Sequence, residues 1–342
     1  PVFDVGMFSR REVGCVFFKS HYDAGRGSIS EYDKFMQEES EAQGKGASAG
    51  LGVDSIILES NPPSASKNTL NGLHVVVLQH GFQGSQFDMR LFRDFLTFLY
   101  PSHKYLIATS NQNDTDVNFD VMGHRLATEI VSFLNDHCGN GGEGLARLSF
   151  VGHSIGGVII RTALHHKAMA PYLSKLHSFV TLSSPHVGHI FSPNYVNTGL
   201  WLMKRWKKSL ALEEISLTDA REYENSFMYR LAQAGGLQLF QKKVLLVSSH
   251  TDTYAPYHSA RLEMCSAAVN DTGQAGHAYR AMLEHLWKGV TAQRVVKVDI
   301  SFKFEETGLD TLIGRAAHIR FLDSFELTAG LVFIWRELWD DD

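Results

Sequence analysis

The chain has 342 residues and a formal net charge of −5. Hydrophobic residues make up 44% of it and charged residues 20%, which is the balance of an ordinary globular protein. The length permits two domains or one large α/β domain with insertions. We favour one large domain, because strand and helix patterns follow each other without long pauses. The net charge is negative, whereas a nucleic-acid-binding surface needs a basic stripe, so we expect no nucleic-acid partner.

Three cysteines, Cys15, Cys138 and Cys265, lie far apart and form no CxxC pair. Free thiols in a reducing compartment are therefore expected, rather than a disulfide framework or a zinc site. The chain opens without a secretory signal and contains no apolar run long enough to span a membrane. We expect a cytoplasmic protein. Whether a targeting segment precedes Pro1 is a question that the sequence leaves open.

The first 70 residues differ in pattern from the rest. Residues 12–18 and 54–60 are strand candidates, and the small, polar, glycine-rich residues 36–53 between them predict a flexible loop. We predict that residues 1–70 form N-terminal strands with this Gly/Ser-rich loop, and that residues 71–342 form the main α/β domain.

A regular alternation of strands and helices begins at Leu73. Residues 73–79 (LHVVVLQ) are almost continuously apolar, as expected of a strand buried on both faces. Further strands are predicted at 104–110, 147–153, 176–184, 243–249 and 294–302. Helices are predicted at 85–100, 119–133, 156–166, 277–288 and 320–338. This alternation predicts an α/β fold with a mostly parallel central sheet and helices on both faces.

Residues 189–215 interrupt the alternation with a connection that is long for a compact domain. The segment mixes large apolar residues with cations, among them Trp201, Met203, Trp206 and Lys207. This composition suits a lid over an apolar site, or a helix that rests on a membrane surface. A core-packing helix with a solvated basic edge is the alternative that the sequence leaves open.

The pattern G-x-S-x-G occurs twice, around Ser48 and around Ser154. In its functional form the serine stands on a strained turn between a strand and a helix, and glycines let neighbouring backbones approach that turn. Ser48 has neither a strand before it nor a helix after it, whereas Ser154 has both. We therefore predict that Ser154 is a nucleophile, the alternative being a tight turn without a chemical role. The predicted nucleophile elbow comprises Gly152, His153, Ser154 and Gly156.

An acyl-transfer serine needs backbone donors that point at the developing oxyanion. One is expected to be the N–H of Ile155, directly after the nucleophile. The other should come from the loop after the strand at 73–79, which reads HGFQG. In this predicted oxyanion loop, His80, Gly81 and Gly84 shape the turn and Phe82 is the candidate donor. An ordinary strand-to-helix turn is the alternative.

The serine also needs a base, and the base needs an orienting acid. Where a serine elbow of this type occurs, the chain order is serine, acid, histidine. Asp252 follows the predicted strand at 243–249 and is the preferred acid. The rival carboxylates lie in less suitable places: Asp219, Asp271 and Asp310.

His318 is the preferred base, because it follows the last predicted strand and precedes a predicted helix. The competing histidines all come before that strand: His250, His258, His277 and His285. Metal binding is the other interpretation of the 17 histidines, through the pairs His165/His166 and His186/His189. No HExxH motif and no clustered carboxylates support it, so we predict no metal site and no cofactor.

With these residues in place, the chain resembles the lipase-like serine esterase family of the α/β-hydrolase superfamily. Within it, the chain is most similar to the group named "family with sequence similarity 135". The resemblance lies between about residues 73 and 338, in the stretches VVVLQHGFQGSQFDMR, LSFVGHSIGGVIIR, VTLSSPHVG, SLTD, SSHTDTYAPYHSARLE and LIGRAAHIRFLDS. It implies an α/β-hydrolase fold and a Ser–Asp–His triad that matches Ser154, Asp252 and His318. Members are usually larger proteins with this domain at the C-terminal end, and residues 40–70 are not part of the pattern.

Two functional hypotheses follow. The first is a serine hydrolase that cleaves a carboxylic ester, with a lipid-like substrate indicated by the apolar residues of 189–215. The same segment is then a candidate for peripheral contact with a membrane surface. The second is a binding or scaffolding module that retains the fold without turnover, since a fold does not by itself imply a function.

Overall fold

The computed structural model of the protein describes residues 16–21, 72–192, 209–302 and 310–340. Its centre is a seven-stranded sheet in the order β1-β7-β6-β5-β4-β2-β3. β1 runs antiparallel to β7, and all the other neighbouring strands are parallel. The strands are β1 (Val16–His21), β2 (Leu73–Gln79), β3 (Lys104–Ile107), β4 (Leu145–His153), β5 (Leu176–Leu182), β6 (Lys243–Ser248) and β7 (Val295–Phe302). The predicted mostly parallel sheet is confirmed.

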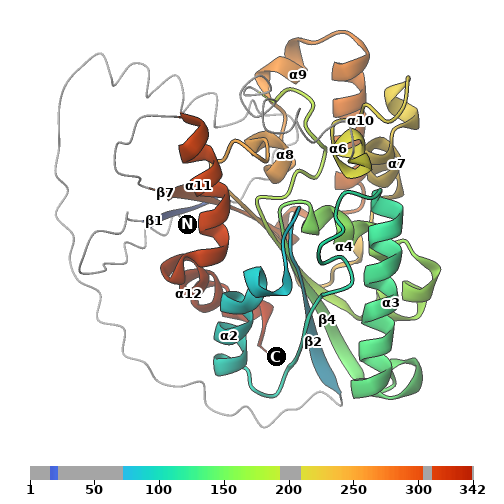
Figure 1. Cartoon of the computed structure of the whole chain (residues 1–342), viewed down its shortest axis with the longest axis vertical. Coiled ribbons are helices and arrows are strands. Elements are labelled where there is room, and N and C mark those ends of the chain that lie inside the picture. Colours follow the sequence, from blue (N-terminus) through green and yellow to red (C-terminus); the bar gives the residue numbers. More distant parts are fainter. Residues whose placement is uncertain (1–15, 22–71, 193–208, 303–309, 341–342) are drawn as a thin grey trace, which may run out of the picture.

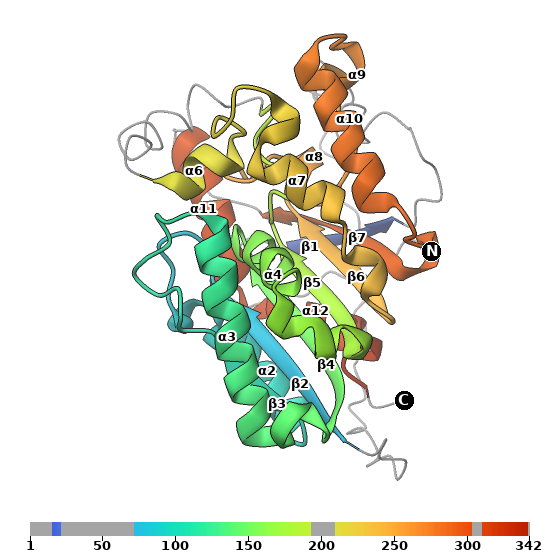
Figure 2. The same cartoon turned by 90° about the vertical axis from the view of Figure 1, so that its right-hand side faces the viewer.

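Helices cover both faces of the sheet (Figure 1). They are α2 (Arg90–Leu99), α3 (Phe119–Cys138), α4 (Gly156–Leu164), α6 (Leu210–Ile215), α7 (Phe227–Ala234), α8 (Tyr257–Arg261), α9 (Ser266–Asn270), α10 (Gln274–Trp287), α11 (Asp310–Asp323) and α12 (Phe325–Ile334). α2, α11 and α12 pack on one face, and α3 and α4 on the other (Figure 2). α7 and α10 pack against each other and contribute to the same core as α3 and α4.

The central strands divide their side chains between two buried cores. In β2, Val75 and Val77 enter the core beneath α3 and α4, whereas Val76 and Leu78 enter the core beneath α2 and α12. Successive side chains of a strand point to opposite faces, so a strand covered on both sides has to be apolar at every position. This is why the almost continuous apolar run at 73–79 indicated a central strand from sequence.

Local signals also set helix ends. Asn118 caps α3, because its side chain accepts a hydrogen bond from the Val121 N–H at 2.9 Å. α3 ends at Gly139, whose φ of 81° suits a residue without a side chain. The glycine-rich residues 139–144 therefore form the turn that follows this helix.

The helix predicted at 320–338 differs from the structure. The chain forms two helices there, and α11 already begins at Asp310, so His318 lies inside a helix rather than before one. Ser324 separates the two, because its hydroxyl caps α12 by accepting from the Leu327 N–H at 3.1 Å. The buried face of α11 includes Gly314 and Ala317, and such small residues give little hydrophobic periodicity in the sequence.

Several sequence predictions fall outside the described residues. These are Ser48, the glycine-rich loop, the strand candidate at 54–60 and most of the segment 189–215. The strand candidate at 12–18 overlaps β1, which joins the sheet beside β7. The boundary between 1–70 and 71–342 stays a prediction. Within the described part of the chain, no helix is long and apolar enough to cross a bilayer.

A cluster of three buried histidines lies at the amino ends of the strands. The ring of His74 lies 4.4 Å from that of His103 and 5.1 Å from that of His177, measured between centroids. His74 Nε2 lies 2.8 Å from the Ser149 hydroxyl. Burial, together with the charges of neighbouring cationic groups, lowers the pKa of His74 well below its usual value and that of His177 to about 4.

This histidine cluster predicts a loss of stability in mild acid. The unfolded chain binds protons at these histidines near pH 6.5, whereas the folded chain keeps His177 neutral down to about pH 4. The free energy of unfolding should therefore be at its full value above about pH 6.5 and decrease as the pH falls through that value. His177 alone should contribute a loss of about 3 kcal/mol across the window.

Urea denaturation at about pH 7.5 and about pH 5 measures about 2 kcal/mol of this loss, because pH 5 still lies above the folded pKa of His177. His177→Asn removes the titrating ring, so its stability should fall less between the two pH values than that of the wild type. His277→Asn, at an exposed position, is the matched control and should behave like the wild type. Equal pH dependence in all three proteins would contradict the prediction.

Candidate functional site

Ser154 stands on a tight turn between β4 and α4. Its backbone is left-handed, with φ of 55°, and its N–H donates to the Leu182 carbonyl at 2.9 Å. A β-carbon on Gly156 would lie 2.5 Å from the Gln79 carbonyl oxygen, and one on Gly152 would lie 2.7 Å from the Gly157 nitrogen. Only glycine fits at both positions, as the predicted elbow requires.

The loop from His80 to Gly84 lies directly against this turn. A β-carbon on Gly81 would lie 2.7 Å from Cβ of Ser154. The Gln83 N–H donates to the Thr115 hydroxyl at 2.7 Å, and the Gly84 N–H donates to the Gly81 carbonyl at 3.1 Å. The predicted oxyanion loop and the predicted nucleophile are therefore neighbours, with Phe82 at the tip of the loop.

His80 begins the loop after β2, and Ile155 directly follows Ser154 in the turn. His80 is fully buried, and burial lowers the pKa of its ring. Its Nδ1 lies 2.9 Å from the Gly81 carbonyl oxygen, so it donates there as a neutral ring. Ile155 is the residue that precedes the first turn of α4. Its N–H thus belongs to a helix N-terminus, where backbone donors face outward along the helix axis.

Asp252 and His318 form a hydrogen-bonded pair, although 66 positions separate them in the chain. The Asp252 carboxylate is fully buried and lies 2.6 Å from Nδ1 of His318, whose side chain is 12% exposed. Asp252 also accepts hydrogen bonds from the Ser183 hydroxyl and, at 2.7 Å, from the Tyr254 N–H. With its proton on Nδ1, the imidazole presents Nε2 as an acceptor, which is the tautomer that a general base needs.

His318 is held between two rings. Tyr254 stacks on it with centroids 5.3 Å apart and an interplanar angle of 21°. His153, the residue before Ser154, lies on it with centroids 4.7 Å apart. The His153 contact places His318, the predicted base, next to the predicted elbow, even though His318 belongs to α11 and does not precede a helix as the sequence predicted.

The rival residues have other surroundings. Asp219 accepts from the Phe227 N–H at the start of α7, and Asp271 accepts from the Gly273 N–H in an exposed turn. His258 contacts the Ile190 carbonyl, and His285 packs against Tyr229. Asp310 begins α11. In the described part of the chain, no group of three or more histidine, cysteine, aspartate or glutamate side chains could hold a metal ion.

Sequence reasoning missed three residues beside the site: Thr115, Ser183 and Tyr254. Ser183 follows the carboxyl end of β5 with φ of 51°, and its position after a buried strand was a usable signal. Tyr254 lies two residues after the predicted acid, within reach of an Asx-type turn. Thr115 lies in a connection without periodic pattern, so nothing in the sequence indicated that it contacts the loop at His80–Gly84.

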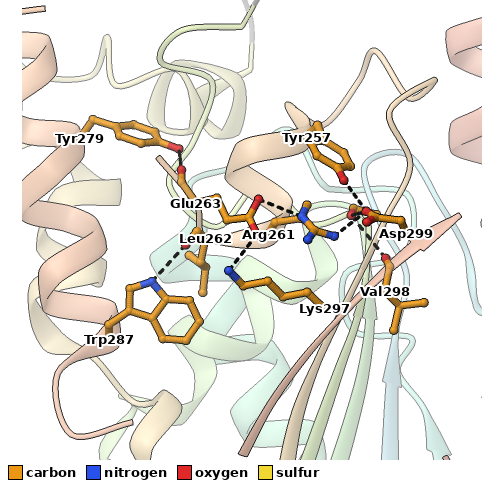
Figure 3. A network of polar contacts seen from close by, with 10 residues as sticks. Tyr257, Arg261, Leu262, Glu263, Tyr279, Trp287, Lys297, Val298 and Asp299 are labelled. Carbon is orange, nitrogen blue, oxygen red and sulfur yellow. Dashed lines mark hydrogen bonds and ion pairs between the residues drawn. The ribbon is translucent and has the colours of Figure 1, made fainter. Parts of the chain in front are cut away.

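An ionic network holds both ends of the segment that carries Asp252 (Figure 3). Asp299, on β7, accepts from the Tyr257 hydroxyl and from Arg261 Nη1, both at 2.5 Å. It also accepts from the Ser248 hydroxyl at 3.4 Å. Ser248 ends β6 and Tyr257 begins α8, so Asp299 ties the two ends of the intervening loop to the same strand.

The network also balances its buried charges. Glu263 accepts from Arg261 Nε at 2.9 Å and from Lys297 Nζ at 2.8 Å. Burial by itself would lower the pKa of Arg261, but Tyr257, Asp299 and Glu263 raise it above its usual value. Two cations thus face two carboxylates, and removal of one carboxylate leaves an excess positive charge in a buried place.

We therefore expect Asp299→Asn to lower the free energy of unfolding by about 3 kcal/mol, because it leaves buried Arg261 with an incomplete partner set. Guanidinium chloride denaturation measures the change. Asp94→Asn is the matched control, since the Arg93–Asp94 pair is exposed and should contribute less than about 1 kcal/mol. Similar effects of the two substitutions would argue against a stabilising network.

The sheet order, the left-handed serine after β4 and the helices on both faces define an α/β-hydrolase fold. Residues 69–267 match the model of the family described as "Putative serine esterase (DUF676)". The match spans more than half of the chain, and the chain belongs to this serine esterase family. The matched range includes Ser154 and Asp252 and ends before His318.

Solved structures with similarity to this chain include hydrolases. The product of gene lin2722 from Listeria innocua is 12% identical, with a TM-score of 0.43 over 76% of this chain and 93% of that chain. An esterase from Exiguobacterium antarcticum is 13% identical, with a TM-score of 0.41 over 80% and 94% of the two chains. Lipase B from Aspergillus fumigatus is 15% identical, with a TM-score of 0.39 over 60% and 45%.

Proposed function

We propose that this chain hydrolyses carboxylic esters with Ser154 as nucleophile, His318 as general base and Asp252 as the orienting acid. The observation that carries the proposal is the 2.6 Å contact between Asp252 and His318 Nδ1, on a histidine that packs against the residue before Ser154. A serine on a strained elbow is a weak nucleophile without a base, and the hydrogen-bonded Asp252–His318 pair beside the elbow supports this assignment.

In this proposal, Ser154 Oγ attacks the ester carbonyl carbon while its proton moves to Nε2 of His318. The negative charge that develops on the carbonyl oxygen is stabilised by the N–H groups of Phe82 and Ile155, by roughly 3 kcal/mol for each donor. The alcohol leaves with the proton from His318. Water then attacks the acyl-enzyme and loses a proton to His318, which returns a proton to Ser154 Oγ as the carboxylic acid departs.

A fluorophosphonate tests this site directly. We expect one adduct by intact mass on the wild type, none on Ser154→Ala, and at least about 1,000-fold slower labelling of His318→Ala, because the hydroxyl is unreactive without its base. Ser48→Ala is the matched control for the second G-x-S-x-G pattern and should label like the wild type. If folded wild-type protein gives no adduct, even with detergent present, the esterase proposal fails and a catalytically silent binding module replaces it.

We further propose that the substrate is lipid-like. The support is the composition of residues 189–215, where Trp201, Met203 and Trp206 stand beside lysines and an arginine. In this proposal the segment covers an apolar acyl site and provides peripheral contact with a membrane surface. The part of it that the structure describes includes buried Ile190 and half-buried Phe191, which follow Ser183, the residue after β5 that contacts Asp252.

An acyl-chain series tests the substrate class. With p-nitrophenyl esters from acetate to decanoate, kcat/KM should rise by up to roughly fourfold for each buried methylene, which corresponds to about 0.8 kcal/mol. Combined Trp201→Ser and Trp206→Ser substitutions should flatten the series while leaving the acetate rate within about twofold, because they remove apolar surface and not the reacting groups. A wild-type series that falls with chain length would instead indicate a small, soluble ester.

A further inference from the structure

His153 occupies a place between three parts of the proposed site. It ends β4 and directly precedes Ser154. Its Nδ1 lies 3.2 Å from the position that a β-carbon on Gly81 would take, so one edge of the ring faces the loop after β2. Its Nε2 lies 3.1 Å from the backbone carbonyl oxygen of His318, so the other edge faces α11. The ring thus fills the space between the elbow, the loop at Gly81 and the helix that carries the base.

The state of this ring follows from its partner. A carbonyl oxygen only accepts, so Nε2 of His153 has to carry the proton and donate it. The ring is buried, and burial lowers its pKa well below the usual value, with the neighbouring His318 lowering it further. His153 is therefore neutral and cannot itself act as a second cation beside His318.

The His153 bond acts on a different part of His318 than the Asp252 bond does. Asp252 contacts the side chain at Nδ1 and orients the ring about its own bonds. His153 contacts the main chain of the same residue, and so sets where α11 stands relative to Ser154. Gly314, one turn earlier in α11, packs so closely on Thr253 that no side chain fits there. α11 is thus held through Gly314 against the loop that carries Asp252 and Thr253, and through His153 against the elbow at Ser154.

We propose that His153 is a positioning residue: its Nε2–H holds the His318 carbonyl and thereby keeps the base within reach of Ser154. This inference rests on the proposed function of the Ser154 site. Misplacement of a reacting group by about 1 Å can cost about 100-fold in rate, so one hydrogen bond to the base-bearing helix can have a large effect on turnover. The ring also packs on the imidazole of His318, with centroids 4.7 Å apart, so His153 acts through the proposed base and not on the substrate.

Two substitutions of similar shape separate the hydrogen bond from simple packing. His153→Gln places an amide donor near the position of Nε2, whereas His153→Met fills a similar volume without a donor. With p-nitrophenyl butyrate, and with rates expressed per fluorophosphonate-titratable site, we expect His153→Met to lower kcat by about 10- to 100-fold with KM changed by less than about threefold. His153→Gln should restore kcat to within about fivefold of the wild type.

Hydrogen–deuterium exchange of α11 provides a readout that does not depend on activity. Loss of the anchor should accelerate exchange of the amides of residues 310–323 in His153→Met, with the wild-type pattern recovered in His153→Gln and in Ser154→Ala. Kinetics of Met and Gln variants that match each other, whether both are wild-type or both are impaired, would overturn the inference. So would unchanged exchange in His153→Met. If the wild type does not label at all, the proposed function fails, while the exchange experiment still decides whether His153 anchors α11.

Discussion

The left-handed backbone of Ser154 imposes the steric constraint on which the arrangement of the whole site depends. A residue with a side chain adopts φ of 55° only where its surroundings require it. Here the requirement comes from close contacts on several sides, with the backbone of β2 against Gly156 and the loop after β2 against the serine itself. The same close approach places backbone donors, a candidate base and the serine in a small volume. The packing that strains the turn therefore also organises the chemistry.

Charge is handled in two ways around this turn. The Asp252 carboxylate is fully buried but surrounded by donors from Ser183, Tyr254 and His318, so its charge is compensated by hydrogen bonds. Further along the strands, Asp299 and Glu263 meet Arg261 and Lys297 in a balanced network. The network lies outside the reacting centre, yet it fixes both ends of the loop that presents Asp252. Stability and geometry of the candidate site are thus linked through β7.

Much of this architecture could be predicted from the sequence, because it depends on local patterns. Apolar runs and glycines at fixed offsets, each within about ten residues, indicate three of its parts. These are the strand at 73–79, the elbow at Ser154 and the loop at His80–Gly84. The start of α11 could not be predicted, since the residues that it buries include Gly314 and Ala317. At Gly314 the close approach of Thr253 leaves no room for a larger side chain. Small residues at buried positions give the sequence no hydrophobic periodicity.

The sequence by itself determined the class of fold, the serine that stands on the turn after β4 and the order in which the candidate acid and the candidate base follow it. Only the tertiary structure decided that the ring of His318 meets Asp252, that Thr115 contacts Gln83 and that His153 contacts the helix that carries His318. The physical reason is the range of the interactions. Strand and turn preferences act between neighbours in the chain, whereas these contacts join residues that are 32 to 165 positions apart. They exist only after the parallel strands have aligned their carboxyl ends at one edge of the sheet.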